Sequence, residues 1–410
     1  MFNTHDIRGG AARAAYRLHQ GMRKADVDSR YIVAHKESDD PHTFAPTSKK
    51  SRTLPFIRSS LDKLPLRLYP RKGKSVYSLN YLPTRKHSTV ISSNPDIVHL
   101  HWIGEGFFGI EDIGKIKKPV VWTLHDMWAF TGGCHYAGTC THYQNRCGSC
   151  PQLHSRQKTD LTTWIFERKK KAWKNIDLTI VTPSRWLGEC ARKSFLFRDR
   201  RVEVIPNGIN PEQFKPHDQA WARSSLNLPL HKRIILFGAM YADSDRRKGM
   251  PELLTALAAL RPDEIDQTAI VIFGASGPQH PCPLKMPCHF MGTLHDNISL
   301  SLLYAAADVV ISPSGEENLS NVVMESLSCG TPVVAFNIGG MPDMIEHMQN
   351  GYLARPCEAA DLAEGIRWVL ENEDRRRKLR ENARTSVLNK YSIDLVVQQY
   401  IDLYKTVLGK

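Results

Sequence analysis

The stretch ISPSGEENLSNVVMESLSCGTPVVAFNIGGMPD, residues 311 to 343, carries the clearest structural signal in the sequence. An apolar run ends at Ser312, a polar turn follows, and helical periodicity begins near Leu319 to Asn321. A second β-branched run, Val333 to Phe336, comes after this helix. A strand, a helix and a strand in this order form a βαβ unit, which predicts a parallel sheet.

Short β-branched runs alternate with helical patterns along the rest of the chain. In the first half we expect strands over residues 29–33, 97–100, 120–124, 178–181 and 202–205. In the second half we expect strands over residues 234–238, 269–274, 309–312 and 333–336, and helices over 251–260 and 300–307. The turn signal Ile205-Pro-Asn-Gly separates the halves. The sequence therefore predicts an α/β protein with two doubly wound parallel-sheet domains joined near Asn207.

The first predicted helix follows a pair of glycines, Gly9 and Gly10. Its apolar face consists of Ala11, Ala15, Leu18 and Met22. In a doubly wound fold a strand precedes such a glycine turn, but only eight residues do so here. Two explanations remain open: the first strand is very short, or the true start of the protein lies upstream.

The composition limits the classes of protein to consider. The chain has 410 residues, of which 41% are hydrophobic and 24% charged, as in globular proteins rather than disordered or fibrous ones. The N-terminus lacks the apolar segment of a secretory signal, and no apolar run reaches the about 18 residues that a membrane-spanning helix needs. We therefore expect a cytoplasmic, reducing location.

The net charge of +13 is concentrated in one segment. Residues 49–86 contain eleven basic residues and a single acidic one, Asp62, and so carry +10 of the net charge, interspersed with leucines and aromatic residues. This mixture is typical of segments that lie on an anionic membrane surface. Binding of single-stranded nucleic acid and a solvated segment without a partner are the alternatives. We expect peripheral contact with the inner face of the cell membrane and no nucleic-acid partner.

The predicted helix near Leu319 begins beside two acidic residues. Its N-terminus offers free backbone N–H groups, which suit a diphosphate. Glu317 and Glu325 are eight residues apart, which on a helix corresponds to about 80° around the axis and ~12 Å along it. Carboxylates so placed suit the hydroxyl groups of two rings, such as a ribose and a second sugar. Elsewhere in the chain, Lys248 is a candidate for a phosphate contact, and an exposed lysine is the alternative.

These motifs resemble those of family 4 glycosyltransferases, which are retaining enzymes of the GT-B fold. Glu317 and Glu325 match the E-x7-E signature of that family, and Arg247-Lys248-Gly249 resembles its basic pair. Gly9-Gly10 resembles the glycine loop that faces the donor diphosphate. The loop before the basic pair is longer than in many members, so that Arg246 or Arg247 must supply one further charge of the family pattern.

The resemblance implies a role for each candidate residue. Glu317 would bind hydroxyls of the transferred sugar and Glu325 the ribose, while Arg247 and Lys248 would stabilise the leaving diphosphate. His125, which follows a predicted strand, would lie by the donor sugar; a structural histidine is the alternative. The other donor-binding residues implied are Gly9, Gly10, Asn318, Leu319, Ser320, Asn321 and Val322.

The resemblance also implies an architecture and an activity. The expected GT-B fold has an acceptor-side domain (residues 1–206), a donor-binding domain (207–390) and a helix (391–410) that returns to the first domain, with the two domains facing a cleft. The expected activity is that of a retaining hexosyltransferase that uses a nucleotide-diphosphate sugar, forms no covalent intermediate and needs no catalytic metal. The expected acceptor is a lipid-linked glycan of surface polysaccharide synthesis.

Four of the nine cysteines form a cluster in the loop 134–150: Cys134, Cys140, Cys147 and Cys150, spaced C-x5-C-x6-C-x2-C. Four thiolates at this spacing suit one structural Zn²⁺ and leave no open position on the metal. Free or redox-active thiols and disulfides are the alternatives, and His135 or His142 could replace one cysteine. The surrounding block, residues 121–153, resembles the subset of the family that acts in exopolysaccharide synthesis of the colanic-acid type.

Two other functions remain open. A non-hydrolysing nucleotide-sugar epimerase shares the two-domain architecture and would convert the donor without an acceptor. A non-enzymatic scaffold would bind membrane or nucleic acid through residues 49–86. The sequence does not indicate the sugar, the nucleotide, the linkage or the oligomeric state.

Overall fold

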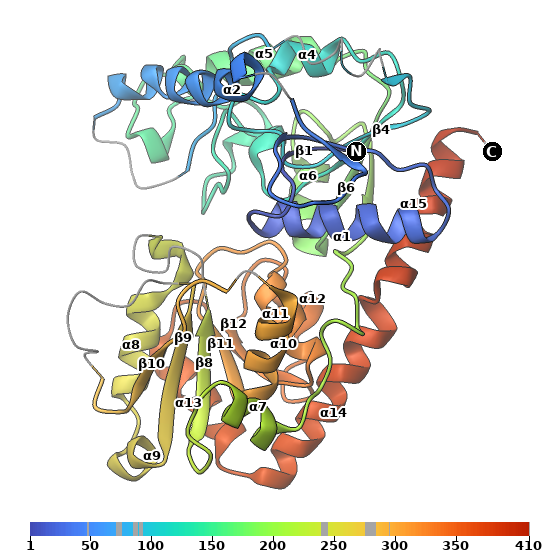
Figure 1. The fold of residues 1–410 in the computed structure, drawn as a ribbon. Helices are drawn as coiled ribbons and strands as arrows, with labels where there is room; N and C mark the ends of the chain where they lie inside the picture. The colour runs from blue at the N-terminus through green and yellow to red at the C-terminus, as the bar shows by residue number, and fades with distance from the viewer. Residues whose placement is uncertain are drawn as a thin grey trace. The chain divides into compact units, whose positions relative to one another are not determined.

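The computed structural model describes residues 1–46, 49–70, 76–84, 89, 93–238, 245–274, 284–294 and 296–409, so parts of the basic segment 49–86 lie outside the described residues. The chain forms two compact units. Unit 1 comprises Met1–Pro206 and Val396–Lys410, and unit 2 comprises Asn207–Leu395. Each unit contains one parallel sheet packed between helices (Figure 1), which confirms the predicted fold class.

The sheet of unit 1 has seven strands, and all its paired strands are parallel. In spatial order they are β3 (Thr43–Phe44), β2 (Tyr31–His35), β1 (Phe2–His5), β4 (Val98–Leu100), β5 (Val120–Thr123), β6 (Leu178–Thr182) and β7 (Arg201–Val204). The strand order reverses between β1 and β4. Ligands of doubly wound sheets bind outside the carboxyl ends of the strands at such a reversal.

The helices of unit 1 cover this sheet. They are α1 (Gly10–Lys24), α2 (Lys49–Asp62), α4 (Ile110–Gly114), α5 (Leu161–Trp173), α6 (Arg185–Lys193) and most of α15 (Ile393–Val407), with the 3-10 turns η1 (Leu64–Leu68), η2 (Trp128–Phe130), η3 (His142–Gln144) and η4 (Pro151–Leu153). Asp160 caps α5, because its carboxylate accepts hydrogen bonds from the backbone N–H groups of Thr162 (2.9 Å) and Thr163 (3.2 Å). The core is rich in aromatic rings; those of Trp122 and Trp173 meet edge to face with centroids 5.2 Å apart.

The sheet of unit 2 has six strands and is also parallel throughout. In spatial order they are β10 (Cys288–Phe290), β9 (Thr268–Phe273), β8 (Arg233–Gly238), β11 (Val309–Ser312), β12 (Val333–Phe336) and β13 (Gly351–Ala354). Alternate residues of β11 enter two different apolar clusters, Val310 one and Val309 with Ile311 the other. Both faces of the strand are therefore buried, which explains its unbroken β-branched sequence. The strand order reverses between β8 and β11.

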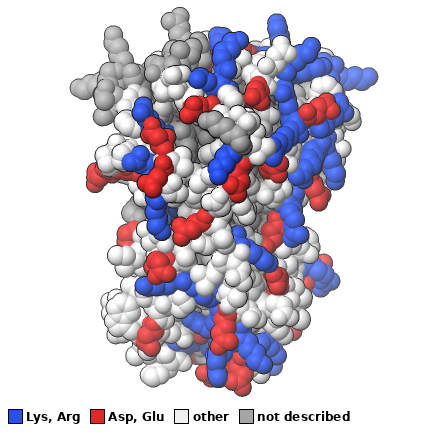
Figure 2. All heavy atoms as spheres, turned by 90° about the vertical axis from the view of Figure 1, so that its right-hand side faces the viewer, with Lys and Arg blue, Asp and Glu red and all other residues white. Residues whose placement is uncertain are grey.

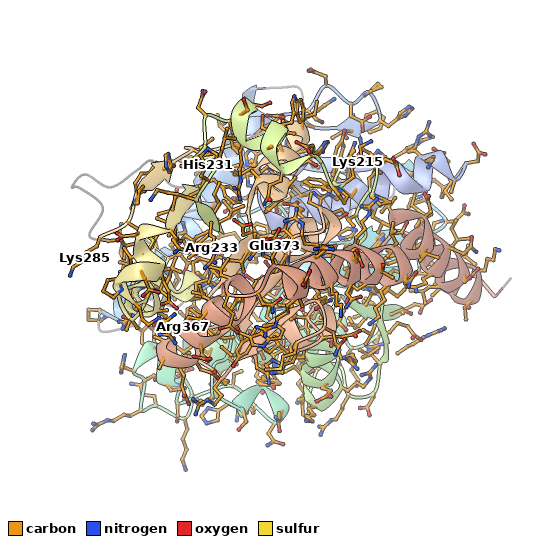
Figure 3. All side chains as sticks on the ribbon, turned by 90° about the horizontal axis from the view of Figure 1, so that it is seen from below. Lys215, His231, Arg233, Lys285, Arg367 and Glu373 are labelled. Carbon is orange, nitrogen blue, oxygen red and sulfur yellow. The ribbon has the colours of Figure 1, made fainter. Side chains whose placement is uncertain are left out.

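The helices of unit 2 lie on both faces of this sheet (Figure 1). They are α7 (Gln219–Ser225), α8 (Met250–Ala258), α9 (Pro262–Asp266), α10 (Asn297–Ala306), α11 (Asn321–Ser328), α12 (Met341–Met344), α13 (Ala359–Leu370) and α14 (Glu373–Lys390), with the 3-10 turn η5 (Arg246–Lys248). The amino ends of the strands form the edge opposite the candidate residues. Arg233, the first residue of β8, and His231 mark that edge in Figure 3.

The end of the chain belongs to unit 1. Tyr400 and Tyr404 of α15 are one helical turn apart and therefore share a face of the helix. The hydroxyl of Tyr400 lies 2.8 Å from Thr123 Oγ1, and the hydroxyl of Tyr404 lies 2.6 Å from Nδ1 of His99. These bonds join the last helix to β5 and β4.

None of the described helices is long and apolar enough to cross a membrane. Figure 2 shows one face of the molecule, on which Lys and Arg side chains gather towards the upper right while acidic side chains are scattered among them.

The predicted strands agree with the structure to within two residues, and 309–312 and 333–336 have the predicted bounds. A four-residue strand, β1, does precede Gly9. Three strands, β3, β10 and β13, are not among the predicted ones. Each is short and lies at or near a sheet edge, and β13 begins with glycine, so that none carries a β-branched run.

Candidate functional site

Three loops come together at the carboxyl edge of the sheet in unit 2. They follow β8, β11 and β12. The backbone N–H of Gly315 donates to the carbonyl of Arg247 (2.9 Å), and that of Gly340 donates to the carbonyl of Glu317 (3.4 Å). Because β8 and β11 flank the reversal of strand order, these loops lie where a doubly wound sheet binds ligands.

Gly249 allows two of these loops to touch. It ends η5 and begins α8 with φ 74°, in the left-handed region. A Cβ at this position would lie 1.8 Å from the carbonyl oxygen of Pro313, which is an impossible contact. The close approach that only glycine permits brings η5 against the loop after β11.

Lys248 and Glu317 meet across these loops. Lys248 Nζ donates to Glu317 Oε2 at 2.9 Å, although the residues are 69 positions apart. Their side chains are 27% and 15% exposed, so both are half-buried and accessible from one side. The structure thus brings together two of the residues singled out by the sequence.

Arg247 is oriented by a residue that the sequence analysis did not consider. Its Nε and Nη2 donate to the two carboxylate oxygens of Asp245 at 3.0 and 2.7 Å. Burial raises the pKa of Asp245, but the hydrogen bonds and charge of Arg247 outweigh that effect and hold the pKa below its ordinary value. Arg246, the other basic candidate, is exposed. Arg247 is therefore the arginine whose position is fixed.

The N-terminus of α11 completes the site in unit 2. Ser320 caps the helix through a hydrogen bond from the N–H of Val323 (3.4 Å). Asn318, Leu319 and Ser320 are buried, whereas Asn321 and Val322 are half-exposed. The structure thus exposes the first turn of the helix more than the residues before it.

Glu325, the residue expected to bind the ribose, is more deeply buried than that role suggests. It is 2% exposed, and its Oε2 accepts a hydrogen bond from the hydroxyl of Tyr304 at 2.9 Å. Tyr304 lies on α10, 21 residues earlier, and was not a candidate in the sequence. A buried carboxylate held by a neutral donor is a fixed acceptor rather than a mobile surface group.

Gly9 and Gly10 lie at the start of α1 in unit 1. Gly9 is the N-cap, and the first turn of the helix contains no acidic residue. A Cβ at Gly9 would meet nothing within 4 Å. The turn therefore has open space beside it and a helix N-terminus that attracts anions.

His125 follows β5 and forms a hydrogen bond with one other histidine. Its Nε2 lies 3.1 Å from Nδ1 of His101, and the ring of His101 lies 4.2 Å from that of His99. Burial lowers the pKa of His125 to about 4, against the charge of Asp126, which raises it. His125 is therefore neutral at pH 7. The signal that sequence reasoning missed is the His-x-His pattern at the end of β4, in which His99 lies on the strand and His101 directly follows it, two positions on.

The four clustered cysteines line one cavity in unit 1. All four thiols are free. As the side chains stand, the described residues contain no group of three or more His, Cys, Asp or Glu that would hold a metal ion.

Two family models match the chain. The model for Glycosyltransferase Family 4 matches residues 8–213, and the model for Glycosyl transferases group 1 matches residues 219–386. The chain belongs to glycosyltransferase family 4.

Curated relatives of this transferase agree with the assignment. An uncharacterized glycosyltransferase of Methanocaldococcus jannaschii is 30% identical over 334 residues, which are 75% of this chain and 82% of that one. A D-inositol 3-phosphate glycosyltransferase of Arthrobacter sp. is 25% identical over 86% of this chain and 88% of that one.

Solved structures share the fold. Sucrose-phosphate synthase from Thermosynechococcus elongatus superposes with a TM-score of 0.66 and 21% identity, over 99% of this chain and 96% of that one. Anabaena HepE in complex with UDP-glucose gives a TM-score of 0.65 and 17% identity, over 99% and 98%. With two parallel α/β sheets in the chain, these likenesses confirm the predicted GT-B class.

The buried histidines of the transferase predict how its stability depends on pH. Burial holds the pKa of both His99 and His101 well below the ordinary value, whereas the same residues in the unfolded chain take up protons below about pH 6.5. The unfolded state then binds more protons, so we expect the contribution of these two histidines to the free energy of unfolding to be constant above about pH 6.5 and to fall as the pH decreases below it. Urea unfolding at pH 7.5 and 5.5 measures the difference.

A matched pair of variants isolates this contribution. His99→Gln is expected to flatten the pH dependence, and His231→Gln, at the exposed edge of unit 2 (Figure 3), is expected to leave it unchanged. An equal slope in both variants would contradict the assignment.

Proposed function

We propose that the transferase is a retaining enzyme that moves a hexosyl group from a nucleotide-diphosphate sugar to a glycan acceptor. The observation that carries this proposal is the ion pair between Lys248 and Glu317 at the carboxyl edge of unit 2, beside the N-terminus of α11. One ammonium and one carboxylate side by side match a donor whose diphosphate is negative and whose sugar carries hydroxyl groups.

The donor roles follow from chemical type. Lys248, Arg247 and the first turn of α11 supply positive charge to the diphosphate. Glu317 accepts hydrogen bonds from hydroxyls of the transferred sugar, and Glu325, oriented by Tyr304, accepts those of the ribose. Gly9, Gly10 and the backbone from Asn318 to Val322 keep the diphosphate contacts implied by the family resemblance. The complex of Anabaena HepE with UDP-glucose supports a donor of this class.

The chemistry we propose needs no enzyme nucleophile. The bond from the anomeric carbon to the diphosphate oxygen breaks, and the acceptor oxygen bonds to the same face of that carbon while its proton passes to the departing diphosphate. Negative charge grows on the leaving group, where Lys248 and Arg247 are already in place; such preorganised charge lowers the barrier without a metal. His125, being neutral, contributes a hydrogen bond and no charge.

We assign the donor to residues 207–390 and the acceptor to residues 1–206, with 391–410 as the return helix of the first domain. The acceptor we propose is a lipid-diphosphate-linked glycan of exopolysaccharide synthesis. The cysteine-containing block, residues 121–153, supports this subset because it resembles that of colanic-acid-type enzymes.

A membrane surface is the partner we propose for α2 and η1. Phe56 and Leu68 are 72% and 80% exposed, and Lys63 and Arg67 beside them are exposed too. Asp62, the single acidic residue of the segment 49–86, is buried and accepts hydrogen bonds from the backbone N–H groups of Leu79, Asn80 and Tyr81. The exposed face of these elements therefore presents apolar and basic groups without an opposing charge, as an anionic bilayer requires.

Co-sedimentation with vesicles tests this surface. We expect binding to vesicles with phosphatidylglycerol and none to neutral phosphatidylcholine vesicles, because about 1 kcal/mol is gained per basic residue near an anionic surface. Phe56→Ser with Leu68→Ser should weaken binding at least tenfold. The control Ile298→Ser, which changes a 74% exposed side chain of unit 2, should not. An equal loss of vesicle binding in Ile298→Ser would contradict the proposed membrane-binding surface.

The function itself is tested with purified full-length protein. We expect a thermal shift with a matching UDP- or GDP-sugar, release of nucleoside diphosphate only when a glycan-lipid acceptor is present, and a product whose anomeric configuration equals that of the donor. Conversion of the donor without an acceptor would favour the epimerase instead. An inverted product, or a requirement for added Mg²⁺ or Mn²⁺ in protein that has not been treated with a chelator, would contradict the retaining, metal-independent mechanism.

A further inference from the structure

Four cysteines and one lysine of unit 1 have no part in the proposed transfer. Cys134, Cys140, Cys147 and Cys150 line a single cavity of about 20 Å³. That volume holds one water or one ion. All four side chains are free thiols, and Cys147 and Cys150 are only 8% and 7% exposed.

The backbone around the cavity is held firmly. The N–H of Cys150 donates to Oδ2 of Asp160 at 2.9 Å, and the hydroxyl of Thr163 donates to the carbonyl of Cys147 at 2.9 Å. Asp160 and Thr163 are also the residues that cap α5. The cysteine loop is therefore anchored to the start of a long helix.

Lys169 of the same helix is buried without a negative partner. Its side chain is 0% exposed; its ammonium donates to the carbonyl oxygens of Trp128 and Thr131 and lies 3.8 Å from the centre of the Trp128 ring. Among the described residues, no carboxylate forms an ion pair with it. A buried charge without a counter-charge is costly, and burial lowers the pKa of Lys169 to about 7, so an anion beside Lys169 would help to keep it charged.

The cavity lies next to Lys169 through a shared residue, and the carboxylate of Asp126 is the other group whose charge acts on the ammonium. Thr131, whose carbonyl accepts from Lys169, also lines it. Cys147 and Cys134 are the groups whose negative charge would interact most strongly with the ammonium. Four neutral thiols add nothing to the effect of Asp126 on this lysine, whereas thiolates would.

We propose that the four cysteines bind one Zn²⁺ as thiolates and that Lys169 is the buried counter-charge of this site. Each thiol gives up its proton to solvent when the metal binds, and four thiolates around Zn²⁺ carry a net charge of −2, which Lys169 reduces. Four protein ligands leave no position for a substrate, so the metal supports the loop rather than the reaction.

The thiols must turn to reach the metal. In the arrangement described above they do not yet converge as metal ligands, and the hydroxyl of Tyr77 lies 2.8 Å from Sγ of Cys150. A change of rotamer about the Cα–Cβ bond moves a cysteine sulfur by about 3 Å, which a 20 Å³ cavity at the centre of the cluster accommodates. The backbone can stay as it is.

Elemental analysis of the purified full-length protein tests the site without any activity assay. We expect about one zinc per chain, four sulfur ligands at about 2.3 Å by zinc X-ray absorption, and cluster thiols that react with a thiol reagent only after a strong chelator is added. Cys147→Ser with Cys150→Ser should remove the zinc, and the exposed control Cys357→Ser should keep it. Folded protein without zinc, or disulfides within the cluster, would overturn the proposal.

The role of Lys169 has its own readout. In competition with a chromophoric chelator, Lys169→Met is expected to lose zinc at about one tenth of the chelator concentration that the parent protein tolerates, and Lys169→Arg, which keeps the charge, to lie closer to the parent. Unchanged competition by Lys169→Met would overturn the counter-charge. If Lys169→Met does not fold, the zinc affinity of Lys169→Arg decides, compared with that of a Lys170→Met control. Zinc binding by Lys169→Arg that is more than tenfold weaker than in this control would show that the positive charge at position 169 is not what the site needs.

Discussion

Glu317→Gln is expected to lower the turnover of the transferase by about a hundredfold to a thousandfold while the protein stays folded. The amide keeps the size of the carboxylate but removes its negative charge, and with it the ion pair to Lys248 Nζ at 2.9 Å. In the proposed mechanism the amide also accepts weaker hydrogen bonds from the hydroxyls of the transferred sugar. Initial rates at saturating donor and acceptor, with the melting temperature measured in parallel, give the result.

Glu373→Gln is the matched control for this variant. Glu373 is the exposed first residue of α14, far along the chain from the candidate residues (Figure 3). We expect its turnover to equal that of the parent protein. Full activity in Glu317→Gln, or an equal loss in both variants, would contradict the role assigned to Glu317.

Lys248→Met is expected to reduce kcat by about a hundredfold. Methionine fills the space of the lysine stem but places no positive charge beside the departing diphosphate. Because that charge is greatest in the transition state, the loss should appear mainly in kcat and less in the KM for the donor. Steady-state kinetics with varied donor separate the two quantities.

Lys285→Met controls for the removal of one positive charge from unit 2. Lys285 is exposed, and its side chain points away from the molecule (Figure 3). It should leave both kinetic constants unchanged. If Lys248 and Glu317 only held their loops together through their ion pair, the double variant would lose no more activity than either single variant. We expect its loss to exceed both, because in the proposed mechanism each residue contacts a different part of the donor.

The fold was predictable where a strand is buried on both faces. Residues 309–312 and 333–336 are continuous apolar runs because helices cover both sides of the sheet, and the sequence shows such runs directly. The strand β1, with the sequence FNTH, is short, and three of its four residues are polar. For that reason the sequence pattern did not decide whether a strand precedes Gly9.

The candidate site was predictable only where its residues form local motifs. Glu317 with Glu325, and Lys248 with its neighbours, stand in short recognisable stretches. Their partners do not: Tyr304 reaches Glu325 from another helix, and His101 reaches His125 from the loop that follows a neighbouring strand. Which strands and helices become neighbours is decided by the order of the sheet, which no short stretch of sequence contains.

The hydrogen bond between His99 and Tyr404 sets an order of events during synthesis. The ribosome makes β4 about 300 residues before it makes α15. Until the last helix leaves the exit tunnel, the nitrogen of His99 and the hydroxyl of Thr123 lack the tyrosines that satisfy them in the native protein. Unit 1, whose first part is translated first, is therefore completed last. If translation stops early, the nascent chain keeps β4 and β5 without the helix that covers them, and chaperones and proteases can recognise this exposed surface.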